Sequence, residues 1–388
     1  MIVKIYRWLI QPLYSVILLA LFSMLAPLSP VVLADGGAPN LAYVAGTAKG
    51  VSVIDVAQQK ITSTINVPSD ANMILLSLDG RYLYATEAQQ GRVAVIAAKT
   101  GELLCTADVP GKPSLLAADV ISGTFFAAGN GAASVSQIDP GNCSIKHTFA
   151  TSGPVYGMYV AAVASSLSPD TGNQLWIANG NQLSIFDDLK YTQIGSITIA
   201  GGPGYVTIPP GATVYTTTRD GNVVAVDLNS HKLLTLISGS KYGPMDYDAS
   251  TGEIYVPDLQ NNQLVVLAPV NAGFAPPPEP SRTIKIGVQP RSIAITNDGA
   301  LGFVALQGGN VAMIDIPSRQ TITTFFVGGE PQFIITGLYP PPVGTTPQQT
   351  STWQIVVSIM GYLFVIVLLI VPLFLYRRYI KKTRQAEG

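Results

Sequence analysis

Side chains that commonly carry catalysis are scarce in this sequence. It contains two histidines, His147 and His231, and a metal or haem site built on histidine needs several of them close together. The motifs G-x-S-x-G and H-E-x-x-H do not occur. We therefore expect no catalytic residues, no metal ligands and no cofactor, and we interpret both histidines as surface residues on or near outermost strands.

One acidic segment, "DYDASTGE" (Asp246–Glu253), has the D-x-D spacing of calcium-binding loops. The complete loop motif, with its terminal bidentate Glu, is missing. The segment also falls where other parts of the chain carry the turns "SLDGR" and "TNDGA". We interpret it as a turn.

Both ends of the chain carry long apolar segments. Residues 1–34 begin with Lys4 and Arg7, continue apolar from Leu13 to Leu28 and finish on small residues, which is the pattern of a signal peptide. An uncleaved membrane anchor is the alternative. Near the other end, Ile355–Tyr376 lacks charge, is long enough to cross a bilayer, and is followed by the basic stretch "RRYIKKTRQ".

These patterns predict a single-pass type I protein of the cell membrane, with its body outside the cytoplasm. Between the signal segment and the span, 15 basic and 22 acidic side chains give a net charge of about −7, which argues against nucleic-acid binding. The expected parts are a signal peptide (1–34), an exported body (35–339), a Pro-rich stalk (340–352), a transmembrane helix (353–376) and a basic cytoplasmic tail (377–388).

The body is an internal repeat. "VSVIDVAQQKITSTINV" (Val51–Val67) is matched by "VAMIDIPSRQTITTFFV" (Val311–Val327), and five further copies lie between them at a spacing of about 43 residues. Each unit contains four short β-rich runs separated by turn residues. Seven such units predict an all-β fold, a seven-bladed β-propeller, to which the C-terminal transmembrane helix is added.

The units resemble the YVTN-type β-propeller repeat, found in exported, surface-layer and YncE-like propellers. "AYVAG…VSVIDV…STINVP" and "QPRSIAITNDG" match its strands in order, and the resemblance extends over Leu41–Tyr339. It implies the propeller architecture. It leaves the function open, because relatives include cell-surface proteins, periplasmic binders and cofactor enzymes.

The ends of the repeat array complement each other. The first unit lacks its innermost strand, and the last has a surplus one, Pro331–Leu338. We expect the surplus strand to complete the first blade, which closes the ring and removes its free edges.

Cys105 and Cys143 fall on outermost strands of neighbouring blades in this arrangement. A disulfide would persist outside the cytoplasm, but it needs Cα atoms within about 7 Å. Because we expect the two cysteines to be offset along the axis, the sequence leaves their bonding open.

The predicted binding surface is one mouth of the central channel, at the Gly/Pro corners and on the face opposite the stalk. Exposed Tyr and Arg favour recognition, so the candidate ligand-binding residues are Tyr156, Tyr205, Arg219, Arg291 and Gln332. Glu87 is expected near the same mouth. The corners themselves are followed by Asn72, Ser114, Tyr156, Tyr205, Met245, Arg291 and Gln332.

Two alternatives to this surface are open. The tyrosines could pack the corners, or a partner could dock at the other face, where the insertions Ala164–Asn173 and Pro269–Ser281 fall.

The predicted function is that of a membrane-anchored, non-enzymatic binding or scaffold module. Its partners would be the membrane, through the C-terminal helix, and an extracytoplasmic protein, peptide or glycan. A propeller enzyme of the quinoprotein or lactonase type and a structural surface-layer component are the alternatives.

Overall fold

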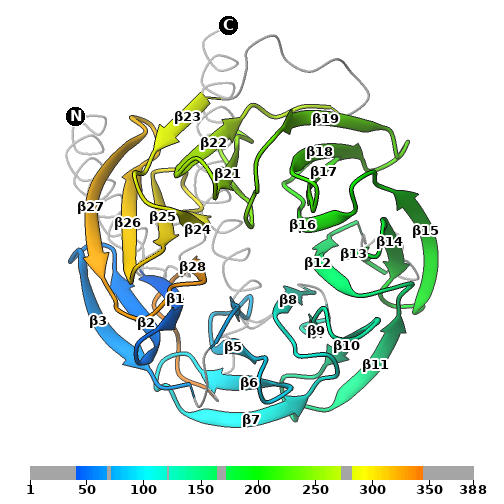
Figure 1. Cartoon of the computed structure of the whole chain (residues 1–388). Coiled ribbons are helices and arrows are strands. Elements are labelled where there is room, and N and C mark those ends of the chain that lie inside the picture. The colour runs from blue at the N-terminus through cyan, green and yellow to red at the C-terminus, as the bar shows by residue number, and fades with distance from the viewer. Residues whose placement is uncertain (1–40, 68–70, 120–121, 164–171, 272–281, 344–388) are drawn as a thin grey trace, which may run out of the picture. The chain divides into compact units, whose positions relative to one another are not determined.

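The structure, a computed structural model, describes residues 41–67, 71–119, 122–163, 172–271 and 282–343. They form seven four-stranded antiparallel sheets placed as blades around a central axis (Figure 1). The predicted all-β, seven-bladed propeller is therefore confirmed. The predicted signal peptide, transmembrane helix and basic tail, and the stalk beyond Val343, lie outside the described residues. None of the described residues belongs to a helix with the length and hydropathy of a membrane span.

Each blade has an innermost, a second, a third and an outermost strand. The innermost strands are β28 (Phe333–Gly337), β4 (Ile74–Leu76), β8 (Leu115–Ala118), β12 (Val155–Ala161), β16 (Pro203–Thr207), β20 (Asp246–Tyr247) and β24 (Pro290–Ile295). The second strands are β1 (Leu41–Thr47), β5 (Tyr82–Glu87), β9 (Phe125–Ala128), β13 (Gln174–Asn179), β17 (Thr213–Thr218), β21 (Ile254–Asp258) and β25 (Leu301–Leu306). The third strands are β2 (Gly50–Asp55), β6 (Arg92–Ala97), β10 (Ser134–Ile138), β14 (Gln182–Asp187), β18 (Asn222–Asp227), β22 (Gln263–Leu267) and β26 (Asn310–Asp315). The outermost strands are β3 (Lys60–Ile65), β7 (Leu103–Asp108), β11 (Ile145–Ala150), β15 (Thr192–Thr198), β19 (Leu233–Ser238), β23 (Arg282–Lys285) and β27 (Gln320–Phe326).

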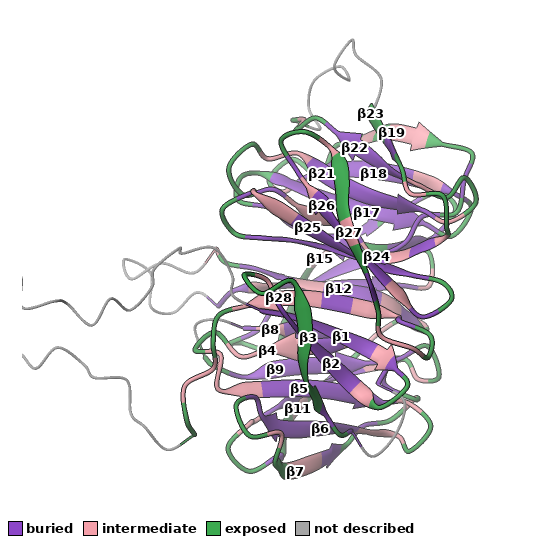
Figure 2. Ribbon diagram, turned by 90° about the vertical axis from the view of Figure 1, so that its left-hand side faces the viewer, coloured by how far each residue is buried: buried purple, intermediate pink, exposed green. Residues whose placement is uncertain are grey.

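The second and third strands of the blades form most of the core. Every residue of β17 is buried, whereas five of the six residues of β3 are exposed (Figure 2). Neighbouring blades share apolar clusters, as where Trp176 of β13 packs with Val214 of β17. A middle strand buried on both faces has no solvent-facing side, so its sequence need not alternate between apolar and polar residues. Most of these strands are apolar runs, whereas β17 fills four of its buried positions with threonine.

The repeated Asp at the end of the third strand builds the hairpin that leads to the outermost strand. In the first unit, Oδ1 of Asp55 accepts a 2.7 Å hydrogen bond from the backbone N–H of Gln58, and Gln59 then adopts a left-handed φ of 49°. A short acidic side chain that bonds backbone two or three residues onward stabilises such turns. Backbone N–H groups are held in the same way by Asp187, Asp227 and Asp315.

The ring closes as the sequence predicts. The last strand, β28, pairs antiparallel with β1, with Leu41 opposite Gly337 and Ala45 opposite Phe333. Just beyond this ladder, Gly46 has a φ of 79°, and a Cβ atom there would lie 2.3 Å from the carbonyl oxygen of Glu330. Glycine is required at this position, because any side chain would push the two ends of the ring apart.

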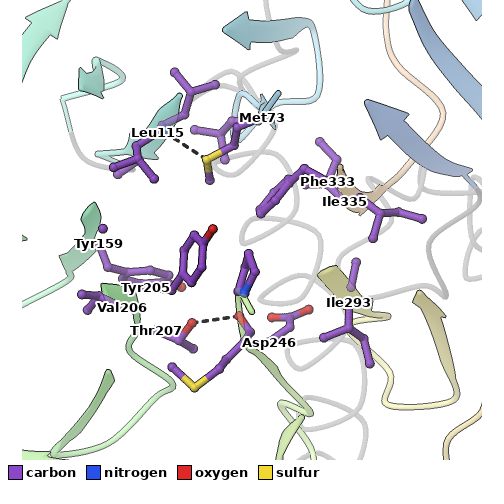
Figure 3. A pocket seen from close by; sticks show the side chains of 18 of the residues that line it. Met73, Leu115, Tyr159, Tyr205, Val206, Thr207, Asp246, Ile293, Phe333 and Ile335 are labelled. Atoms are coloured by element: carbon purple, nitrogen blue, oxygen red, sulfur yellow. Dashed lines mark hydrogen bonds between the residues drawn. The ribbon is translucent and has the colours of Figure 1, made fainter. Parts of the chain in front are cut away.

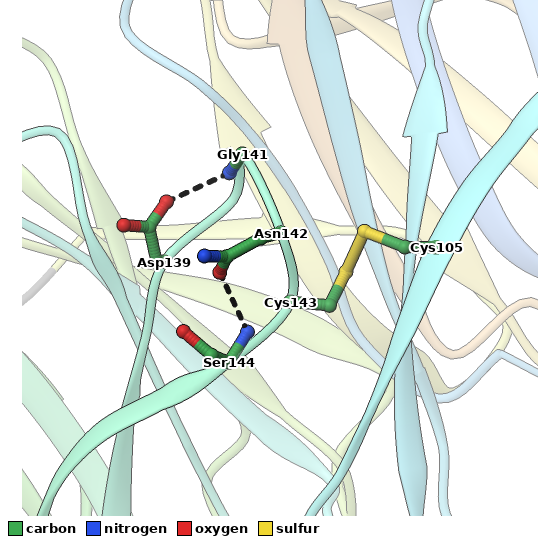
Figure 4. The surroundings of a disulfide bond; sticks show 6 residues. All are labelled: Cys105, Asp139, Gly141, Asn142, Cys143 and Ser144. Carbon is green, nitrogen blue, oxygen red and sulfur yellow. Dashed lines mark hydrogen bonds between the residues drawn. A yellow bond between two sulfur atoms is a disulfide. The ribbon is translucent and has the colours of Figure 1, made fainter.

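The structure joins Cys105 and Cys143 in a disulfide, with the Cα atoms 6.1 Å apart (Figure 4). Cys105 lies in β7, and Cys143 lies in the turn before β11 rather than on the outermost strand itself. This turn places Cys143 within reach of the neighbouring blade, so the expected offset does not prevent the bond. The bond ties the second blade to the third.

Candidate binding site in the central channel

A channel with a volume of about 780 Å³ follows the axis of the ring, and all seven innermost strands contribute to its lining. Figure 3 shows the ring of Tyr205 and the ring of Phe333 extending into it from opposite sides. Its wall combines apolar side chains, among them Met73, Val206 and Ile293, with polar ones such as Asn72 and Gln332. A preformed concave site of this size and composition is typical of a small-ligand pocket.

The seven residues that follow the Gly/Pro corners all line this channel. Tyr205 keeps 38% of its surface exposed, so it does not merely pack its corner. Desolvation of its hydroxyl raises the pKa of Tyr205 above the usual value, so the phenol is a neutral hydrogen-bond donor at physiological pH, as an unshifted tyrosine would also be. Among the predicted residues, Tyr156, Tyr205, Arg291 and Gln332 are thus brought together around one channel.

Arg291 is the basic side chain at this mouth. One of its terminal nitrogens lies 3.7 Å from a carboxylate oxygen of Glu330, a half-exposed ion pair at the rim. Its Nε is buried and has no hydrogen-bond partner among the described residues. A guanidinium held this way retains donors for an acceptor group on a ligand.

Arg219 lies in the turn between β17 and β18, beside the mouth residue Tyr156. It does not line the channel; its guanidinium carbon stacks 4.3 Å from the centre of the Tyr156 ring. The same guanidinium donates to the carbonyl of Gly180 at 2.7 Å and to Oδ1 of Asn181 at 2.9 Å. Arg219 therefore packs against the ring of Tyr156 and restricts its orientation at the mouth.

Glu87 does not reach the mouth. Its side chain is fully buried at the end of β5 and pairs with Arg92. It does not contribute to the lining of the channel.

Asp246 lies deeper in the channel and was not among the residues that sequence reasoning selected for binding. Its Oδ2 accepts a 2.6 Å hydrogen bond from the backbone N–H of Ile295 in the next blade. Burial raises the pKa of this carboxyl to about 7, against the effect of two backbone N–H donors. The calcium-like segment is a turn as interpreted, but it begins at Asp248, whose carboxylate binds Ser250 and Thr251.

A sequence signal for Asp246 did exist. At the position after the corner residue, four other units carry the apolar residues Met73, Leu115, Val206 and Phe333, and the remaining two carry the small residues Gly157 and Ser292. None of these residues is charged, so an acidic residue at this position departs from the repeat, and such departures are expected at functional sites.

A pair of buried acidic residues, Asp119 and Asp188, lies between the third and fourth blades. Burial, and next the neighbouring carboxylate of Asp119, raise the pKa of Asp188 to about 7. Asp119 accepts a 2.7 Å hydrogen bond from Nδ2 of Asn173. One oxygen of Asp188, Oδ2, has no hydrogen-bond partner among the described residues.

The histidines lie toward the periphery. His147 is half-buried in β11 and stacks on Tyr191 with 4.1 Å between ring centres, and His231 is exposed in the turn before β19. Within the described ranges, no group of three His, Cys, Asp or Glu side chains is arranged to hold a metal ion.

No family model and no curated protein matches this sequence. Among solved structures, the chain is similar to the hydrazine synthase of Kuenenia stuttgartiensis, at 17% identity and a TM-score of 0.54, over 66% of this chain and 79% of that one. It is also similar to the dihydro-heme d1 dehydrogenase NirN, at 13% identity and a TM-score of 0.56, over 76% and 74%. A third similar structure is the β-propeller domain of Myceliophteria thermophila Cps50 (Swd1), at 13% identity and a TM-score of 0.60, over 72% and 93%.

These likenesses show the seven-bladed propeller fold and nothing finer. The similar structures include two named as enzymes and one named as a propeller domain, and at such identities a shared fold does not carry function.

Proposed function

We propose that this protein is a membrane-anchored extracytoplasmic binding module whose ligand enters the central channel through the mouth between Tyr205 and Arg291. The observation that carries the proposal is that an exposed phenol and a half-buried guanidinium stand at the rim of one preformed channel. Tyr and Arg in a concave, partly dehydrated setting supply most binding energy in recognition sites. Because the pocket is already formed, little conformational entropy is lost on binding.

The path of the chain fits a tethered module. The chain passes Gln332 at the mouth, continues through β28 and leaves the ring at Tyr339, at the opposite end of that strand. A tether beginning at this opposite face leaves the mouth free for a ligand. The predicted stalk and span would supply that tether.

Capture of a ligand from native envelope extract tests the proposal. The soluble body (Asp35–Val343) is used as bait, and Tyr205→Ala and Arg291→Ala are compared with the parent. Tyr191→Ala serves as the matched control, because Tyr191 is similarly exposed at 41% but lies at the outer rim of its blade. We expect both mouth variants to lose at least tenfold in capture, with melting temperatures within about 2 °C of the parent.

Two results would count against the proposal. One is normal capture by both mouth variants together with loss of capture when residues 270–280 are deleted, which would place binding at the other face. The other is a redox-active cofactor or metal present at one per chain in the purified body, which would favour the enzyme alternative.

A further inference from the structure

The channel has an uneven charge distribution. Of the residues that line it, only Asp246 and Arg291 carry charged side chains. Arg291 lies at the rim beside Glu330. No lysine, arginine or histidine among the described residues lies within ion-pair distance of Asp246. The interior of the channel therefore presents one carboxylate without a counter-charge.

The protein holds this carboxylate in a fixed orientation. The backbone N–H of Ile295 donates to Oδ2, and the N–H of Tyr247 also hydrogen-bonds the carboxylate. The residue is not sealed away, since it keeps part of its surface open to the channel. Two donors aimed at the anionic form favour a charged group at this depth.

Two phenols lie near the same position, and further aromatic rings line the channel. Tyr159 of β12 and Tyr247 of β20 share a hydrogen bond between their hydroxyls, and the charge of Asp246 acts on both phenols. The rings of Tyr205 and Phe333 extend into the channel in the same view as the carboxylate (Figure 3). Aromatic faces attract cations through the ring quadrupole, most strongly where water is excluded.

The free-energy balance points the same way. Burial raises the pKa of Asp246 to about 7, so keeping the charged form here is unfavourable until a cation arrives. An ammonium group beside the carboxylate would offset the cost of desolvating its charge. The apolar body of such a ligand would pack against the lining residues Met73 and Val206.

We propose that Asp246 and the aromatic residues of the channel form a subsite for an organic ammonium group, a protonated amine carried on an apolar body. This inference rests on the proposed binding function and adds the chemical class of the ligand. The ammonium would ion-pair with Asp246 while the apolar part contacts Tyr205 and Phe333. A ligand with a carboxylate or a hydroxyl in place of the ammonium group would lack the electrostatic attraction to Asp246.

Three probes of nearly equal size test this subsite: phenethylamine, phenethyl alcohol and phenylacetate. Each is titrated into the full-length protein in detergent by calorimetry at pH 7.5. We expect phenethylamine to bind at least tenfold more tightly than the other two. Preference for the alcohol or the carboxylate, or binding of none of the three at millimolar concentration, overturns the proposal.

The variant Asp246→Asn tests whether the carboxylate of Asp246 is the group that binds the amine. Asp246→Asn keeps an acceptor oxygen for Ile295 while removing the negative charge, and it should weaken phenethylamine binding at least tenfold without changing the affinity for the alcohol. Asp108→Asn is the matched control, because it removes an exposed carboxylate from the outermost strand β7. Unchanged amine affinity in Asp246→Asn contradicts the proposal. If that variant does not fold, the order of the three probes on the parent protein decides.

The two proposals fail separately. Loss of envelope-ligand capture in Tyr205→Ala, with no amine preference in the probe series, would retain the binding function and reject the ammonium subsite. Amine binding that depends on Asp246, with capture unaffected by both mouth variants, would retain the subsite and reject the proposed mouth for the envelope ligand.

Discussion

Tyr339 donates a hydrogen bond of 2.5 Å from its hydroxyl to Oδ2 of Asp55, across a sequence separation of 284 residues. Asp55 ends the third strand of the first blade, and Tyr339 follows the strand that completes that blade. The bond fastens the departing chain to the blade that it closes. It is also the foremost reason why the pKa of Asp55 is lowered, and it raises the pKa of Tyr339.

Tyr339→Phe tests whether this contact supports the closure. We expect a small decrease in melting temperature, since Tyr339 is exposed and water can replace its hydroxyl as the donor to Asp55. Asp55→Asn should cause a larger decrease, because Asp55 also holds the backbone of Gln58. In a double-mutant cycle the two effects should be less than additive. Strict additivity would show that the hydrogen bond contributes nothing to closure.

Removal of β28 tests the closure itself. A body ending at Glu330 leaves β1 without its inner neighbour and uncovers the cluster in which Ile334, Val44 and Phe303 pack. We expect this body to unfold or to melt at least 10 °C below a body ending at Val343, because buried apolar contacts and a full strand ladder are lost. Circular dichroism on heating measures both. Equal melting temperatures would contradict a stabilising role for the closing strand.

The disulfide between Cys105 and Cys143 should stabilise the ring measurably. It closes a segment with a sequence separation of 38, for which loss of chain entropy in the unfolded state corresponds to about 4 kcal/mol. The double variant Cys105→Ala, Cys143→Ala should lower the free energy of unfolding in urea by a comparable amount. A reductant should destabilise the parent and leave the double variant unchanged. A parent insensitive to reductant would contradict the expectation.

Stability should fall as the pH rises from about 4 to about 7. In the unfolded chain an Asp loses its proton near its usual pKa of 3.8, whereas the pKa of Asp188 in the folded protein is about 7. The folded state then binds more protons than the unfolded state across this interval, so raising the pH favours unfolding. Asp246, with its pKa of about 7, acts in the same direction. Carboxyls with lowered pKa values, such as Asp248 and Asp258, oppose this only at lower pH.

Asp188→Asn isolates this effect. Its amide cannot titrate and can donate to Asp119, so the variant should resemble the protonated acid at every pH. We expect urea denaturation to show the parent less stable at pH 8 than at pH 5, and the variant to lose part of this difference. An identical pH dependence in parent and variant would argue against the raised pKa of Asp188.

Several features follow from the sequence alone, because they depend on local periodicity and on turn chemistry. The sequence motif shared by Val51–Val67 and Val311–Val327 predicts a hairpin between the third and outermost strands. Its aspartate, Asp55 in the first copy and Asp315 in the last, accepts a backbone hydrogen bond in the same turn of each. The first unit lacks an innermost strand and the last has a surplus one, Pro331–Leu338, which together predict closure of the ring. The pairing of β28 with β1 confirms it. Residues after the corners must face the axis, since the innermost strands begin there, and all of them line the channel.

Other features were decided only by how the blades pack against one another. The left-handed turn at Cys143 and the axial level of Cys105 determine the disulfide, and neither can be read from spacing. Arg219 lies in an exposed turn, yet its direction toward Tyr156 depends on the neighbouring blade, which supplies the acceptors Gly180 and Asn181. The environment of the Asp246 carboxylate, which has backbone donors but no counter-charge, is likewise set by the packing of neighbouring blades. A strand pattern predicts which face of a sheet a side chain lies on, but not its partners in the neighbouring sheet.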